Sequence, residues 1–89
     1  MRNFVIFIEG ENFNLEVEGV SRPVGFFASR RMEAETEEAA SSAVLSRLLS
    51  EPEIEGKALP GYTVFVKMVH EMPLDHKNEY HGFTFFPME

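Results

Sequence analysis

Hydrophobic and polar positions alternate along much of the first third of the chain. Residues 3–10, NFVIFIEG, form a β-branched and aromatic run that ends in glycine, which is typical of a strand. Within residues 13–19, Phe13, Leu15 and Val17 alternate with polar residues. A period of two predicts a strand with one buried and one solvated face. Because the link between the two segments is short, the pattern predicts a hairpin.

A turn and a third strand are predicted next. Residues 20–23, VSRP, contain a proline that has no N–H to give to a ladder, so we expect a turn there. Residues 24–34 alternate again, with Phe26 on one side of the predicted strand and Phe27 on the other.

The period changes to that of a helix within residues 36–50. Thr36 is a suitable N-cap, and two glutamates follow it in the first turn, where the helix dipole favours negative charge. Ala40, Val44 and Leu48 recur every four residues and form one apolar stripe. A proline two residues beyond this range sets the expected end of the helix.

The last third of the chain predicts two more strands joined by polar segments. Residues 51–61 form an acidic, turn-rich connection, 62–72 a buried strand, 73–80 a loop and 81–86 a short strand. The expected order is therefore β-β-β-α-β-β, a mainly antiparallel five-stranded sheet with one helix packed on one face. A chain of this length forms one small α+β domain, residues 1–89.

A single helix covers only one face of such a sheet and leaves the other face open. Strand parity places three phenylalanines on the open face, more apolar surface than a monomer usually exposes. We therefore expect a homodimer or other homo-oligomer with charged residues around the contact. The alternative is that residues 51–61 or the C-terminal residues 81–89 cover this face within the chain. The expected interface residues are Val5, Phe7, Phe27, Arg31, Phe65, Lys67 and Val69.

The connection 51–61 is also a candidate contact for another protein. An ordered link of this length is longer than most connections between secondary-structure elements, and its acidic residues would favour a basic partner. Salt-sensitive association would distinguish this contact from an apolar one.

Composition narrows the classes of function. The chain has no cysteine, which excludes disulfides, cysteine-bound zinc and thiol catalysis, and favours a reducing cytoplasm. Its net charge of −7 argues against nucleic-acid binding, which depends on a basic surface. We find no leader-like segment and no apolar run of membrane-spanning length. A cytoplasmic protein without membrane association is expected.

The three histidines lie together near the C-terminus and raise the question of a metal site. Histidine ligands of zinc usually come in pairs spaced i, i+4 on a helix or i, i+2 on a strand, whereas the spacings here are six and five. The cluster could still converge in space and hold a metal or support acid–base chemistry. A small-molecule or metal-binding protein, with or without enzymatic activity, is therefore the alternative function. The candidate metal ligands are His70, Asp75, His76 and His81.

The sequence contains no motif for nucleophilic catalysis by serine or for phosphate binding. No serine lies in a G-x-S-x-G or S-x-x-K context, and the six glycines are scattered and form no phosphate-binding turn. We therefore expect no cofactor and no catalytic residue. The leading hypothesis is a small non-enzymatic protein-interaction module.

The order β-β-β-α-β over residues 1–72, the acidic chain and the helix entry AETEEAA resemble the partner-binding domain of HicB-type antitoxins. This resemblance implies a small sheet with one helix and self-association. It also implies a partner that is a small RNA-cleaving toxin. The chain is similar as well to many short bacterial proteins of unassigned function.

Overall fold

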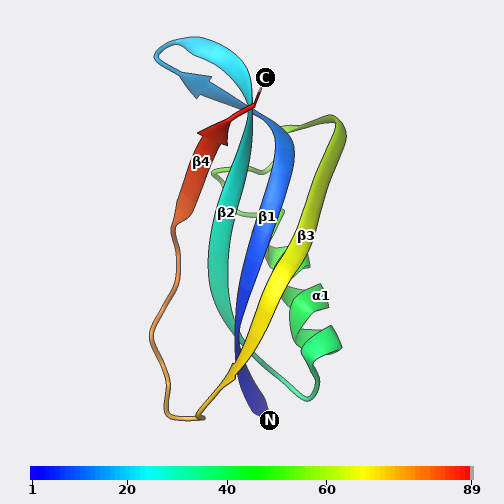
Figure 1. Ribbon diagram of the computed structural model, residues 1–89, viewed down its shortest axis with the longest axis vertical. Helices are drawn as coiled ribbons and strands as arrows, with labels where there is room; N and C mark the ends of the chain where they lie inside the picture. The colour runs from blue at the N-terminus through cyan, green and yellow to red at the C-terminus, as the bar shows by residue number, and fades with distance from the viewer. Residues whose placement is uncertain (89) are drawn as a thin grey trace.

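The computed structural model describes residues 1–88, except for the side chain of Val17. The elements in chain order are β1 (Arg2–Val17), β2 (Val20–Ala34), α1 (Glu37–Leu48), β3 (Ala58–Met72) and β4 (Phe83–Pro87), as Figure 1 shows. The sheet has the strand order β3-β1-β2-β4, and all neighbouring strands are antiparallel. The α+β class with one helix is therefore confirmed.

The expectation of five strands is wrong, because β1 is one long strand where two were predicted. The chain passes through a bulge between Gly10 and Phe13 without reversing, and Asn12 takes the left-handed conformation there with φ 64°. Asparagine tolerates that region better than most residues, so a local irregularity replaces the expected turn.

The chain reverses further on, at Glu18 and Gly19, which have φ values of 53° and 79°. Two consecutive positive φ values are typical of the tight turn that joins two antiparallel strands. The expected turn at 20–23 is therefore wrong, since β2 already begins at Val20 and Pro23 lies within the strand opposite Asn14.

The helix is the element that sequence predicts best. The Ala39 N–H donates to Thr36 Oγ1 at 3.1 Å, which confirms the N-cap. Ala40, Val44 and Leu48 are the buried residues of α1, so the stripe is confirmed too. Because β2 and β3 are both antiparallel to β1, they run in the same direction, and α1 crosses between them over one face of the sheet (Figure 1).

The core lies between α1 and this face of the sheet. The segment after the helix, predicted as an acidic, turn-rich connection, adds Ile54 to the core, where it is buried. Leu15 packs against the core as the alternation predicts. The side chain of Val17, predicted on the same face, lies outside the described part of the chain. The buried apolar side chains of the core include Phe4, Ile6, Ile8, Phe13, Val24, Phe26, Val44 and Leu48.

A second bulge, in β3, changes which side chains face the helix. Phe7 pairs with Met68 while Ile8 pairs with Val66, so Lys67 is the extra residue. One extra residue reverses the alternation beyond it. Val69 therefore packs against the core, and its expected place on the open face is wrong.

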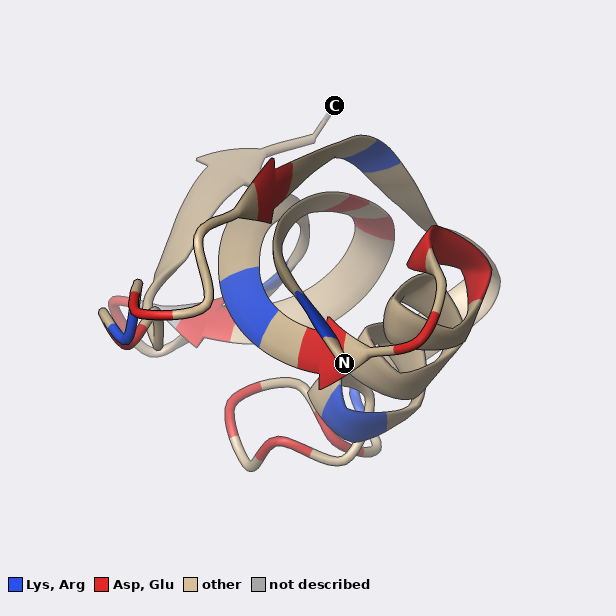
Figure 2. Ribbon diagram, turned by 90° about the horizontal axis from the view of Figure 1, so that it is seen from below, with Lys and Arg blue, Asp and Glu red and all other residues tan. Residues whose placement is uncertain are grey.

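The C-terminal part crosses from one edge of the sheet to the other. Residues 73–82, here called the strap, leave β3 and pass the end of the sheet, after which β4 pairs with β2 (Figure 1). The sheet itself is strongly curled when seen end-on (Figure 2). The molecule is elongated, with principal extents of 43 × 23 × 20 Å.

Gly10 gives a direct test of the packing within the sheet. A Cβ atom built there would overlap the ring of Phe26, a side chain without exposed surface. We expect Gly10→Ala to lower the free energy of unfolding by about 1–3 kcal/mol through overpacking, measured by urea denaturation. Gly82→Ala is the matched control, because nothing lies within 4 Å of its Cβ position. Equal stability of the two variants would contradict this account.

Candidate functional site

The sheet face turned away from α1, here called the open face, carries a group of large apolar side chains. Phe7 on β1, Phe27 on β2, and Phe65 and Met68 on β3 form this group, here called the apolar cluster. Their exposed fractions are 40%, 44%, 41% and 51%. The strand register explains their proximity, since Phe65 and Phe27 lie opposite Glu9 on either side of β1, and Met68 lies opposite Phe7.

The edge of the cluster on β4 is supported by a close packing contact. The ring of Phe86 lies 5.0 Å from that of Phe27, centroid to centroid, at an interplanar angle of 33°. A Cβ atom at Gly25 would overlap the Phe86 ring, so a glycine is required for this ring to lie flat on β2. The exposed cluster therefore rests on an ordered aromatic layer.

One ion pair lies within the apolar cluster. Lys67 Nζ is 3.1 Å from Glu9 Oε1, and the Glu9 side chain is only 13% exposed. Lys67 Nζ also lies 5.7 Å from the centroid of the Phe27 ring, within the range of a cation–π contact. Lys67, which shares the open face with Phe65, thus supplies the counter-charge for a largely buried carboxylate.

A hollow adjoins the cluster where β4 and the strap meet β2. It has a volume of about 410 Å³. The hollow is an open depression of the surface and not an enclosed cavity. The open face thus carries exposed apolar side chains in one part and a hollow in another. The hollow is lined by Phe7, Phe27, Ser29, Tyr80, Gly82 and Thr84, among others.

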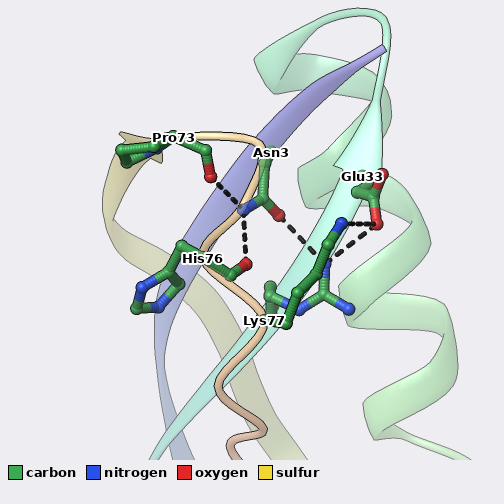
Figure 3. A network of polar contacts seen from close by, with 6 residues as sticks. Asn3, Glu33, Pro73, His76 and Lys77 are labelled. Atoms are coloured by element: carbon green, nitrogen blue, oxygen red, sulfur yellow. Dashed lines mark hydrogen bonds and ion pairs between the residues drawn. The ribbon is translucent and has the colours of Figure 1, made fainter.

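The strap covers the end of the open face where β1 begins. The Asn3 side-chain amide donates to the carbonyl oxygens of Pro73 and His76, both at 2.9 Å, and Asn3 Oδ1 accepts from Arg31 at 3.1 Å (Figure 3). Asn3 has no exposed surface, and Val5 beside it is 3% exposed. Part of the face is therefore covered internally, while the apolar cluster is not.

Ion pairs hold the same end of the sheet together. Hydrogen bonds from Arg31, and then from Lys77, lower the pKa of Glu33 below its usual range. A hydrogen bond from Arg2 lowers the pKa of Glu71 in the same direction. All these groups are substantially exposed, so their contribution to stability is small.

A second pocket, of about 280 Å³, lies between α1, β2 and the strap. Arg30 and Arg47 line it, but the N–H groups of Arg30 are already occupied by internal acceptors. They reach Glu51 at 2.9 and 2.7 Å, and the carbonyl oxygens of Ser29, Gly82 and His81. Arg30 therefore joins the turn after the helix to the strap, and its role in this pocket is structural.

The three histidines make separate contacts. Nε2 of His70 lies 2.8 Å from the Met68 sulfur on the open face, that of His76 lies 3.0 Å from the Tyr80 hydroxyl, and that of His81 lies 2.9 Å from Glu79. Within residues 1–88, no three histidine or acidic side chains are arranged to hold a metal ion. Asp75, the fourth candidate ligand, is an exposed residue of the strap.

Among the expected interface residues, the structure brings Phe7, Phe27, Phe65 and Lys67 together. Val5 and Arg31 lie on the same face but under or beside the strap, and Val69 lies on the other face. Sequence reasoning missed Met68, Phe86 and Glu9. For Met68 the signal was hidden, because a simple alternation along β3 takes no account of the bulge at Lys67.

The connection expected to contact a partner is only partly exposed. Ile54 is buried, Glu51 binds Arg30, and β3 already begins at Ala58. Contact with another protein through residues 51–61 stays a prediction. In the part of the chain that the structure describes, no helix has the length and apolar character needed to cross a membrane.

Comparisons with known proteins give no family for this chain. No family model matches it, and no curated protein or solved structure is significantly similar. The resemblance to the antitoxin domain accordingly stays a prediction from sequence.

Proposed function

We propose that this chain is a non-enzymatic protein-interaction module that associates with itself through its open face. The observation that supports this is the apolar cluster: four large side chains, each about 40–50% exposed, lie together on neighbouring strands. Contiguous apolar surface of this kind is typical of contact sites. Burying it would also stabilise a small domain, whose single core provides little stability.

The edges of the sheet support an interface on the face in preference to one at an edge. Unpaired edge strands can add strands from other chains unless a bulge, a charge or a proline prevents it. The edge strand β3 has its bulge at Lys67 near the middle, and the other edge strand, β4, is five residues long and ends in Pro87. Both edges carry such protection, whereas the side chains of the apolar cluster stay 40–51% exposed in the described chain.

Charge also favours this face for contact between two acidic chains. The charged groups that pair there are mixed in sign: Glu9 with Lys67, and Glu33 with Arg31 and Lys77. Like-charge repulsion between copies is weakest where each copy presents balanced charges. The charges nearest the apolar cluster are therefore balanced, although each chain carries a net charge of −7.

Solution mass tests the proposal directly. We expect light scattering after size exclusion to give about twice 10.2 kDa at high protein concentration, falling toward the monomer mass on dilution. A monomer mass at every concentration up to the millimolar range would overturn self-association.

A further inference from the structure

The open face has a two-sided shape that fits a second copy of the chain in one arrangement. On one side of β1 lies a ridge, the exposed side chains of Phe65 and Met68 on β3. On the other side lies the hollow of about 410 Å³, which is lined by Phe7 and Phe27 together with Ser29, Gly82 and Thr84, among others. Phe7 on β1 lies between ridge and hollow, because the strand order is β3-β1-β2-β4.

We propose that two copies pack face to face about a two-fold axis parallel to β1. This inference rests on the proposed function, since it specifies how the self-association takes place. Rotation by 180° about an axis above β1 places β3 of one copy over β2 of the other, next to β4. The ridge of each copy then enters the hollow of the other, so the same contact forms twice. Such self-complementarity is what a symmetric dimer requires.

The alternative two-fold axis lies across the strands and gives no such fit. It places β3 over β3, so that ridge meets ridge and the two hollows stay empty. Sheets that pack face to face keep their strand directions within about 30° of each other. Both axes satisfy this packing rule, whereas only the axis parallel to β1 also matches the shape of the face.

The ion pair within the cluster has a defined role in this arrangement. Glu9 is on β1, in the same row across the sheet as Phe65 and Phe27, so the Glu9 residues of the two copies approach each other near the axis. Each Glu9 already pairs with Lys67 at 3.1 Å, so the centre of the dimer holds two acidic and two basic groups. Lys67 therefore positions Glu9 and neutralises a repulsion that would otherwise lie at the axis.

A mixing experiment tests the arrangement. The double variant Phe65→Ala with Met68→Ala removes the ridge, and Thr84→Trp fills the hollow from an exposed site on β4. Each variant alone should dimerise at least about tenfold more weakly than the wild type. Mixed together they should form a heterodimer. In it, the tryptophan takes the place of the missing ridge at one contact, and the second contact is native.

Native mass spectrometry distinguishes the heterodimer from both homodimers by mass, and circular dichroism confirms that each variant is folded. Gly82→Leu is a second way to fill the hollow, at a position with free space around its Cβ. A wild-type dimer whose variants form no heterodimer on mixing would overturn the ridge-in-hollow arrangement and leave self-association intact. A monomeric wild type would overturn both proposals.

Discussion

Replacing Phe65 by glutamate should give a folded monomer. The side chain is 41% exposed in the isolated chain, so the core does not depend on it. In the dimer, the carboxylate would lose water without gaining a partner. We expect dimerisation to weaken at least about thirtyfold, which corresponds to about 2 kcal/mol. Light scattering measures the mass, and far-ultraviolet circular dichroism shows whether the helix is retained.

Two further variants separate this effect from a general effect of charge. Phe65→Lys should dissociate the dimer as well, because an ammonium group buried in the contact also loses its water. This is expected even though its charge is opposite to that of the neighbouring Glu9. Val20→Glu is the matched control, an exposed apolar residue in a strand away from the cluster. Dimers that persist in both Phe65 variants would place the interface elsewhere.

Replacing Asn3 by alanine should be the most destabilising single change at the strap. Its side-chain N–H groups donate to the carbonyl oxygens of Pro73 and His76, and its Oδ1 accepts from Arg31. The Asn3 side chain has no exposed surface. Alanine leaves these groups without their partner, which costs about 2–3 kcal/mol in total. For a domain of this size, the melting temperature should fall by about 10–20 °C.

Asn78→Ala is the control for this effect, since Asn78 is an exposed asparagine in the same segment. A change there should stay within about 0.5 kcal/mol. If Asn3→Ala and Asn78→Ala melt at the same temperature, the strap is not held by the Asn3 amide. Contacts other than the Asn3 amide would then have to keep the strap over Val5.

Local signals in the sequence predicted the helix almost completely. A cap residue, an acidic first turn and an i, i+4 stripe all act within one or two turns, and each is found in α1. The aromatic residues of the open face were also predicted correctly up to Phe65, because alternation holds along a regular strand. Prediction succeeded where the determining contacts are close in sequence.

Two of the errors come from local irregularities of the strands, which the hydrophobic pattern does not reveal. At Asn12 the chain continues where a short polar link suggested a turn. At Lys67 a single extra residue moved Met68 to the open face and Val69 to the core. The partial cover of the face by the strap depends on Asn3 and residues about 70 positions later, a contact that only the folded chain shows.

The strand order also has a consequence for how the chain folds. Only the β1–β2 pair joins strands that are consecutive in the chain, since β3 pairs with β1 across the helix, and β4 pairs with β2 across β3. Loop closure makes distant pairings slow, so we expect the long hairpin to form first and β4 to add last. The hollow on the open face is completed by this last strand and by the strap. A chain still emerging from the ribosome would therefore present Phe65 and Met68 on β3 before the hollow is complete. In the arrangement proposed above, pairing between copies would then wait for β4.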